Sequence, residues 1–269
     1  MADSRPRLHP TALIDPAAEL AADVEVGPYC VIGPHVTIGA GTVIASHVVI
    51  EGRTTIGQRN RIAPFNSIGG APQDKKYAGE PTRLEIGDDN VIREYGTFNL
   101  GTMQGGGVTR IGSDNWLMGY IHIAHDCIVG DHTIFANKVQ LAGHCQVGDW
   151  VIFGGDSGVH QFVHVGAHAF TGIGTWLRQD VPPFVMVAGE PPAPHGINVE
   201  GLKRRGFEPA TIASLRTAYK SLYRSGLTLD EARSAIEAQT VAAVDTAQAA
   251  DALRTLSRFL GSVTRGIVR

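Results

Sequence analysis

Histidine is concentrated in one stretch of the 269-residue sequence, where seven of the 11 His lie between positions 122 and 168. An imidazole titrates near working pH, so a neutral His beside an acid suits general-base catalysis at an alcohol. His125 is followed directly by Asp126. A His cluster can also hold Zn²⁺, which needs three or four converging ligands, or it can form a solvated polar face. Three interpretations therefore compete.

The zinc interpretation would require His122, His125 and His144 to converge from different segments. Neither C-x-x-C nor H-E-x-x-H, the spacings typical of many zinc sites, occurs in the chain. The density of His in this stretch is high for a solvated face. We therefore favour general-base chemistry and expect no bound metal.

A six-residue repeat must position these side chains. Aliphatic or aromatic residues recur at every sixth position, with two breaks, from Leu8 to Ile68, from Ile86 to Phe98 and from Ile111 to Val165. An amphipathic helix would repeat near 3.6 residues and a half-buried strand at 2, so neither fits. Three short strands separated by tight corners do fit. The repeat therefore predicts 18-residue coils of a parallel β-helix, stacked about 4.8 Å apart.

The 18-residue coils also predict which polar residues lie near one another. The repeats that begin at Ile123, Leu141 and Val159 start 18 residues apart and should stack on one face. Two columns of side chains follow, one of Asp126 with His144 and one of His125 with Gly143 and Gln161. Members of the cluster are expected within about 5–10 Å of one another along the axis.

The repeat also outlines the domains. It breaks near residues 69–85 and 99–110, where we expect loops that project from the coils, the usual place for function on a rigid scaffold. It ends near residue 190. Pro209 then stands at a plausible first helical position, and Thr228 with Glu231 forms a capping box. We expect a β-helix over 1–190 and an α-helical domain over 191–269.

Composition narrows the class of protein. The net charge of −3 argues against a general nucleic-acid binder, and no apolar run approaches the roughly 20 residues of a membrane span. The N-terminus lacks the apolar segment of a secretory signal, and three Cys cannot form a disulfide framework, so we expect a cytoplasmic protein without an integral membrane segment. Residues 1–190 carry 12 Lys and Arg against 19 Asp and Glu, whereas residues 191–269 carry 11 against 7. An acidic β-helix is thus joined to a basic helical domain.

The cysteines are better explained by packing than by chemistry. Cys30, Cys127 and Cys145 all occupy the fifth place of the repeat, where small residues point inward. Cys127 and Cys145 should stack one coil apart, but parallel side chains are poorly aimed for a disulfide. We expect buried free thiols and no acyl-cysteine intermediate.

Several segments carry a resemblance to known families. The repeat resembles the hexapeptide-repeat transferases, whose members form left-handed β-helices. The more specific segments are IGGAPQDKKYAGEPTRLEIG, HIAHDCIVGD, LAGHC, GVHQFVHVG, QDVPPFVMVAGEP and INVEGLKRRGF. Together they resemble the acyl-[acyl carrier protein]–UDP-N-acetylglucosamine O-acyltransferase family, which opens lipid A biosynthesis. The resemblance implies a mainly β fold, a left-handed parallel β-helix with a C-terminal α-helical domain.

The resemblance also implies an activity. Members are homotrimers with active sites between subunits, and they move a 3-hydroxyacyl chain from the phosphopantetheine of acyl carrier protein to the glucosamine 3-hydroxyl, without a cofactor of their own. His125 would be the general base, Asp126 would orient it, and the Gly143 N–H would face the oxyanion. The residues implied in substrate and carrier binding are Gln73, Asp74, Lys76, His122, His144, His160, Gln161, Asn198, Glu200, Arg204 and Arg205.

The other histidines of this stretch and Ile173 lead to further expectations. We expect His132, His164 and His168 to be solvated. Ile173 stands where members that accept longer chains have Gly, so a branched side chain should shorten the acyl tunnel and favour a shorter donor. The rivals are a related N-acyltransferase with an extra N-terminal uridine-binding domain, a zinc hydratase of the γ-carbonic anhydrase type, and a non-enzymatic β-helix.

Overall fold

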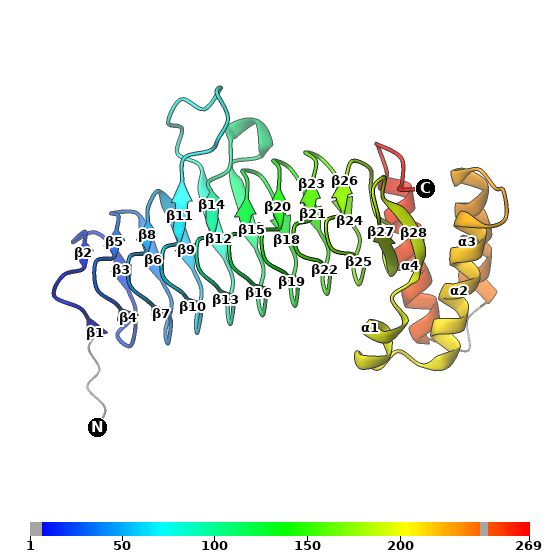
Figure 1. The fold of residues 1–269 in the computed structure, drawn as a ribbon, viewed down its shortest axis with the longest axis horizontal. Coiled ribbons are helices and arrows are strands. Elements are labelled where there is room, and N and C mark those ends of the chain that lie inside the picture. The colour runs from blue at the N-terminus through cyan, green and yellow to red at the C-terminus, as the bar shows by residue number, and fades with distance from the viewer. Residues whose placement is uncertain (1–6, 243–246) are drawn as a thin grey trace.

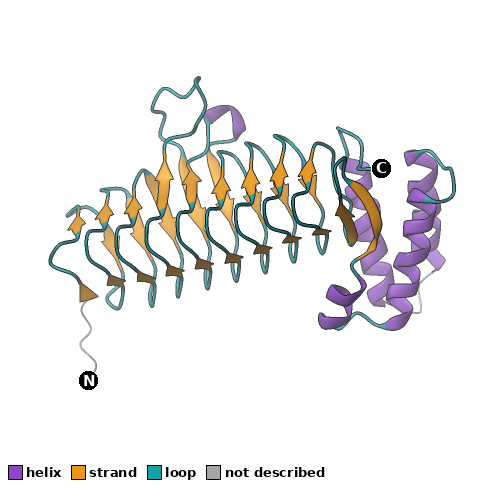
Figure 2. Cartoon of the chain, viewed as in Figure 1, coloured by secondary structure: helices purple, strands orange, loops and turns teal. Residues whose placement is uncertain are grey.

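The computed structural model describes residues 7–242 and 247–269 and shows a long β-helix with helices packed at its C-terminal end (Figure 1). Short strands pair in parallel with the strand one coil later and build three faces that run the length of the β-helix (Figure 2). The predicted left-handed parallel β-helix with a C-terminal α-helical part is confirmed.

The three faces are named A, B and C. Face A consists of β1 (Arg7–Leu8), β4 (Glu25–Val26), β7 (Val43–Ile44), β10 (Arg61–Ile62), β13 (Val91–Ile92), β16 (Trp116–Leu117), β19 (Ile134–Phe135), β22 (Ile152–Phe153), β25 (Phe170–Thr171), β27 (Val185–Ala188) and β28 (Ala193–Ile197). Face B consists of β2 (Leu13–Ile14), β5 (Val31–Ile32), β8 (Val49–Ile50), β11 (Ser67–Gly70), β14 (Thr97–Asn99), β17 (His122–Ile123), β20 (Gln140–Leu141), β23 (Gly158–Val159) and β26 (Trp176–Leu177). Face C consists of β3 (Glu19–Leu20), β6 (Val36–Ile38), β9 (Arg53–Ile56), β12 (Arg83–Ile86), β15 (Val108–Ile111), β18 (Ile128–Val129), β21 (Gln146–Val147) and β24 (His164–Val165).

The sixth-position residues point into the β-helix, as the repeat predicts. In face B, Ile50 pairs with Ile68, which pairs with Phe98, and all three are fully buried. Like residues therefore stack on like residues along the axis, and each coil extends one continuous apolar core. The core holds the coils in a fixed register, so a residue's place in the repeat decides where its side chain lies.

Many corners between faces use a residue in the left-handed backbone region. Asp126 and His144 have φ of 62° and 63°, values that cost a non-glycine residue about 1–2 kcal/mol. Side chains at equivalent corners stack outside the coil, as in Phe65 on Tyr95 and Tyr95 on Tyr120, whose ring centroids lie 5.2 and 4.8 Å apart. Such stacking offsets part of the backbone strain and aligns corner side chains in columns.

Two loops leave the β-helix from a single edge. Residues 71–82 join β11 to β12, and residues 100–107 join β14 to β15 and contain a 3₁₀ helix, η1 (Met103–Gly105). Both connections run from face B to face C, and both project on the same side of the β-helix (Figure 2). His125 and Asp126 lie between β17 and β18, which is the same edge. We call it the B–C edge.

The helical part follows a hairpin. Antiparallel β27 and β28 close face A, so the last strand lies beyond residue 190, and four helices follow in the described part of the chain. These are α1 (Val199–Arg204), α2 (Pro209–Tyr223), α3 (Leu229–Ala242) and α4 (Ala247–Ser262). The predicted start of α2 at Pro209 and the capping box of Thr228 with Glu231 are confirmed. Helices α2, α3 and α4 share one apolar cluster.

The chain then returns to the β-helix. The Asp180 N–H donates to the Gly266 carbonyl at 3.0 Å, and the Val268 N–H donates to the Asp180 carbonyl at 2.9 Å. Val268 packs into the core of the β-helix. The C-terminal residues thereby tie the helical part to the last coils. Within 7–242 and 247–269, none of the helices combines the length and apolar character that a membrane crossing needs.

Candidate active site

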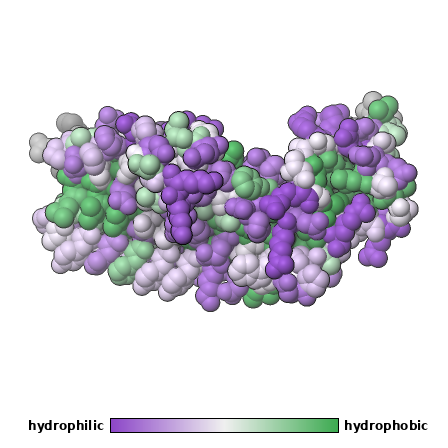
Figure 3. Space-filling model, turned by 90° about the horizontal axis from the view of Figure 1, so that it is seen from above, coloured by the Kyte–Doolittle hydropathy of each residue, from purple (hydrophilic) through white to green (hydrophobic). Residues whose placement is uncertain are grey.

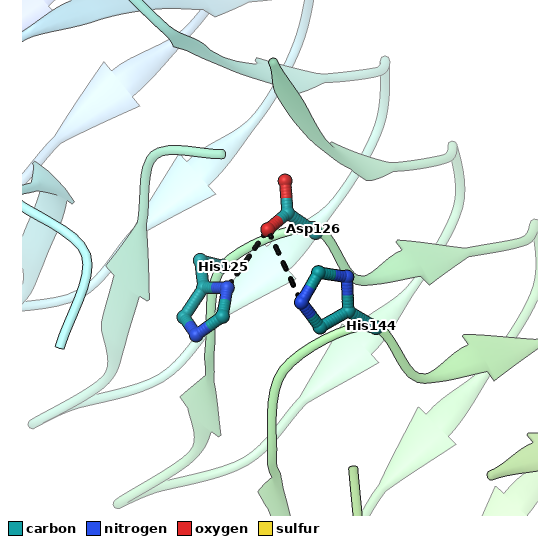
Figure 4. A group of neighbouring side chains, drawn as sticks. All are labelled: His125, Asp126 and His144. Carbon is teal, nitrogen blue, oxygen red and sulfur yellow. Dashed lines mark hydrogen bonds and ion pairs between the residues drawn. The ribbon is translucent and has the colours of Figure 1, made fainter. Parts of the chain in front are cut away.

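Three side chains meet at the B–C edge on two successive coils. His125 Nδ1 lies 2.8 Å from Asp126 Oδ2, and His144 Nε2 lies 3.7 Å from the same oxygen (Figure 4). The two imidazoles lie edge to face with centroids 5.1 Å apart. The predicted column of Asp126 with His144 is therefore confirmed.

Asp126 is a buried acid whose carboxylate is fully engaged. Its side chain is 1% exposed. The Thr102 N–H donates to Oδ1 at 2.7 Å, and the Thr102 hydroxyl donates to Oδ2 at 2.6 Å. Asp126's own N–H donates to Thr109 Oγ1 at 2.8 Å. An acceptor so placed holds the proton of His125 on Nδ1 and leaves the Nε2 lone pair available.

Gly143 lies directly beside His125. A Cβ added to Gly143 would lie 2.6 Å from His125 Cε1 and 2.8 Å from Nε2, closer than real contacts allow. The predicted column of His125 with Gly143 is thus confirmed. Among the hydrogen bonds of the described residues, none is donated by the Gly143 N–H, although its neighbour His144 donates to the His125 carbonyl at 3.0 Å. A free backbone donor therefore lies next to the imidazole.

Burial disfavours protonation of the other two candidate imidazoles near His125. Burial, followed by the charge of His125, lowers the pKa of His122, whose Nδ1 lies 2.8 Å from Thr97 Oγ1. Burial also lowers the pKa of His144, which stacks on Phe162 at 4.4 Å. Neutral imidazoles can accept or donate a hydrogen bond to a polar ligand without adding positive charge.

The structure brings together a different set of possible metal ligands from the one that the sequence suggested. The ligand atoms of His125, Asp126 and His144 lie within 4.8 Å of one another, close enough to surround an ion. Asp126 therefore takes the place that His122 holds in the sequence-based zinc alternative. In this arrangement His125 Nδ1 is hydrogen-bonded to the carboxylate, and our expectation of no metal stays a prediction.

The first loop lies close to this cluster. Asp74 is near enough to His144 for its charge to act on that imidazole's pKa, in the direction opposite to burial. Asp74 Oδ1 accepts the Lys76 N–H at 3.0 Å, and Lys76 itself is exposed. Gln73 reaches a groove on face B. The loop thus brings Asp74 toward the B–C edge and Gln73 to face B, whereas Lys76 stays exposed.

That groove has a volume of about 640 Å³. Its walls are Gln73, Tyr95, Thr97, Tyr120, Ile121, His122, Lys138, Gln140, Asp156, Gly174 and Trp176. It extends across face B from His122 to the edge where faces A and B meet. Ile173, 79% exposed, precedes Gly174 at that edge. Seen from the side of the projecting loops, hydrophobic residues gather at the N-terminal end and among the helices, and between them hydrophilic residues are interspersed with smaller hydrophobic patches (Figure 3).

His160 and Gln161 occupy the next coil of the B–C edge, and the C-terminal segment touches them. Arg265 Nη1 donates to the Gln161 carbonyl at 2.6 Å and lies 3.3 Å from His160 Nδ1. Sequence reasoning missed Arg265 because it lies about a hundred residues away, outside the repeat. No spacing signal connects it to this turn.

The four candidates from the helical part lie elsewhere. Asn198 caps α1, and its Nδ2 donates to the His168 carbonyl at 3.1 Å. Arg205 lies 5.1 Å from the centre of the Trp150 ring and 3.2 Å from His168 Nδ1. Trp150 and His168 stand at the edge between faces C and A. Within one chain, Asn198, Glu200, Arg204 and Arg205 therefore belong to a different edge from His125.

The prediction that His168 is solvated is wrong. Its ring stacks between Trp150 and Phe184, with centroids 6.3 and 5.4 Å away, and Phe207 meets it edge-on. Burial, aided by the Arg205 charge, lowers the pKa of His168 to about 4. Its place in the repeat could not show this, because Phe184 lies beyond the repeat and Arg205 and Phe207 come from the turn after α1.

The prediction of buried free thiols is confirmed. Cys30, Cys127 and Cys145 are free and buried. Burial raises the pKa of Cys127 well above its usual range. A buried neutral thiol is a poor nucleophile, so these residues act in packing.

The chain is similar to known families and curated proteins over nearly its whole length. Residues 180–268 match the family described as "Udp N-acetylglucosamine O-acyltransferase; Domain 2", and residues 5–40 and 109–143 match the bacterial transferase hexapeptide repeat. A curated acyl-[acyl-carrier-protein]–UDP-N-acetylglucosamine O-acyltransferase from Thiobacillus denitrificans is 61% identical over 97% of this chain and 99% of its own length. One from Janthinobacterium sp. is 56% identical over the same shares.

Solved structures give the same result. A structure of LpxA from Acinetobacter baumannii aligns with a TM-score of 0.93 and 49% identity, over 98% of this chain and 100% of the other. The UDP-N-acetylglucosamine acyltransferase of Francisella novicida aligns with a TM-score of 0.92 and 40% identity, over 97% and 94%. The chain is therefore an acyltransferase and belongs to the acyl-[acyl carrier protein]–UDP-N-acetylglucosamine O-acyltransferase family.

Proposed function

We propose that the protein transfers a 3-hydroxyacyl chain from acyl carrier protein to the 3-hydroxyl of UDP-N-acetylglucosamine, as the first step of lipid A biosynthesis. Family membership supports the two substrates, which the relatives' names contain. The observation that carries the chemistry is the His125–Asp126 pair, an imidazole hydrogen-bonded at 2.8 Å to a buried acid.

In this proposal His125 is the general base. Asp126 accepts the Nδ1–H, so Nε2 is the atom that takes the proton from the sugar 3-hydroxyl. The sugar oxygen then attacks the thioester carbonyl carbon directly, and no acyl-enzyme forms. The negative Asp126 stabilises the imidazolium produced in this step.

The tetrahedral intermediate needs a donor for its oxyanion. The Gly143 N–H lies beside His125 without an acceptor among the described residues, and one such donor is worth about 3 kcal/mol in an enclosed site. When the intermediate collapses, the carbon–sulfur bond breaks and the His125 Nε2 proton passes to the departing phosphopantetheine thiolate. The new oxygen–carbon bond, the broken thioester and the transferred proton balance.

The proposed substrate-binding residues lie on two different edges of one chain, so a single chain cannot gather them into one site. His122, His144, His160 and Gln161 lie along face B and the B–C edge, whereas Arg205 lies at the edge between faces C and A. We infer a homotrimer in which α1 of one subunit completes the site of its neighbour. Mixing His125→Ala chains with Arg205→Ala chains should restore activity that neither variant has alone. Failure of the mixture, with subunit exchange shown independently, would remove this arrangement.

The donor side follows from charge and shape. The basic helical part, with exposed Arg204, suits an acidic carrier protein. The groove on face B leads from His122 toward Ile173, so the acyl chain would lie along it and end near that side chain. A cytoplasmic location fits both substrates in this proposal.

The decisive test replaces the base. His125→Ala should lower kcat by about a thousandfold, the usual scale for loss of a positioned general base, in an assay of hydroxyacyl transfer from acyl carrier protein. The matched control is His132→Ala, because His132 Nδ1 also meets a carboxylate, Asp114 Oδ2, at 2.6 Å, but at another edge. Equal activity in both variants would reject His125. A chelator should leave wild-type turnover unchanged, and loss of activity restored by zinc would favour a metal mechanism.

A further inference from the structure

The second loop folds back over the acid of the proposed catalytic pair. Thr102 is 1% exposed, and it contacts Asp126 across 24 positions of sequence with both its backbone and its side chain. We propose that Thr102 is a positioning residue, which fixes the Asp126 carboxylate so that Oδ2 faces His125. This inference rests on the proposed function of His125 as the base.

Two donors from one residue determine the plane of the carboxylate. The Thr102 N–H binds Oδ1 and its hydroxyl binds Oδ2, at 2.7 and 2.6 Å. Hydrogen bonds to an ionised acceptor are the short, strong class, and two from one rigid group prevent rotation of the carboxylate. His125 Nδ1–H then meets Oδ2 at 2.8 Å in a fixed direction.

The hydroxyl of Thr102 has no freedom to turn elsewhere. It accepts the Gly105 N–H at 3.2 Å as the N-cap of η1. Since its lone pair faces Gly105, its single hydrogen is committed to Asp126. The 3₁₀ turn therefore sets the direction of the donor, and the loop acts as part of the site.

Gly105 brings the loop this close. A Cβ on Gly105 would collide with the Asp126 carboxylate carbon and both of its oxygens. The following residue, Gly106, has φ of 93°, a backbone region that favours glycine, and closes η1. The glycines of this loop thus permit a contact between backbone and carboxylate that side chains would block.

Without the hydroxyl, Asp126 has a competing partner. His144 Nε2 lies 3.7 Å from Oδ2, and a small rotation of the carboxylate would favour His144 over His125. Thr102 therefore selects which of two imidazoles the acid serves. Its loss should reduce the fraction of His125 held in the reactive orientation without changing the substrate groove on face B.

The experiment compares three variants of the full chain. Thr102→Val removes the hydroxyl and keeps the shape, and we expect kcat to fall about tenfold with KM for both substrates nearly unchanged, as for loss of one hydrogen bond to a charged group. Thr102→Ser keeps the donor and should restore most of the activity. The matched control is Thr228→Val, because Thr228 also donates its N–H and hydroxyl to a carboxylate, that of Glu231, at 2.8 Å in the helical part.

A double-mutant cycle shows whether Thr102 acts through Asp126. Once Asp126→Asn has removed the charge, adding Thr102→Val should lower kcat by much less than tenfold. Full additivity, or a Thr102→Val enzyme with wild-type kcat, overturns the inference. If wild-type enzyme transfers no acyl chain, or His125→Ala keeps full activity, the proposed function itself fails, so the two outcomes are distinguishable.

Discussion

His168 should make the stability of the protein fall as the solution is acidified from pH 7 to pH 5. Its imidazole is enclosed by Trp150, Phe184 and Phe207, and its Nδ1 lies 3.2 Å from an Arg205 nitrogen. Only a neutral ring can accept a hydrogen bond from a guanidinium. Protonation therefore breaks this contact and places two positive charges side by side.

Stability falls in acid because the pKa of His168 is lower in the folded protein than in the unfolded chain. The folded pKa of His168 is about 4, below the unperturbed value near 6.5, so the unfolded chain binds the proton first. Stability is complete above the unfolded pKa and is lost as the pH falls through the interval from 6.5 to 4. Between pH 7 and pH 5 the loss from this one group amounts to about 2 kcal/mol.

Urea unfolding at both pH values, followed by tryptophan fluorescence at one protein concentration, measures this loss. His168→Gln keeps an acceptor for Arg205 and removes the titration, so its pH dependence should be smaller than that of wild type by about 2 kcal/mol. His195→Gln, at an exposed position in β28, should behave as wild type. The reasoning fails if His168→Gln loses as much stability between pH 7 and pH 5 as the wild type does.

Three further predictions concern activity. Gly143→Ala should lower kcat more than KM, by at least about tenfold, because its Cβ would displace the His125 ring that lies 2.6 Å away; a wild-type kcat would contradict the contact. Ile173→Gly should shift the preference toward longer 3-hydroxyacyl donors in a competition assay, and an unchanged profile would place the length limit elsewhere. Arg265→Ala should raise KM about fivefold with little change in Tm, since it removes the donor to the Gln161 carbonyl; an equal loss in kcat alone would argue against a binding role.

The geometry of the candidate site was predictable wherever the repeat runs without interruption. Residues 18 positions apart stack in successive coils, so the period alone places Asp126 next to His144 and His125 beside Gly143. Parallel pairing in register then converts sequence spacing into distance. The same period identified Cys127 as an inward residue.

The period could not predict contacts made by segments outside it. Thr102 reaches Asp126 from a loop that breaks the repeat, and Arg265 reaches Gln161 from the C-terminus. His168 lies within the repeat, yet its burial depends on Phe207, which comes from the helical part. In each case a second segment docks on a predicted corner, and docking depends on surfaces that a one-dimensional spacing does not describe.

The coils and the second loop contribute to the candidate site in different ways. The β-helix holds His125 and Gly143 at a fixed separation, which the proposed roles of base and oxyanion donor require. Selection of the reactive partner instead depends on Thr102, which lies in a loop and is held by only a few hydrogen bonds. Loops open at lower free energy than a stacked core. In the proposed mechanism the loop therefore orients the Asp126 carboxylate, while the stacked coils set the position of His125.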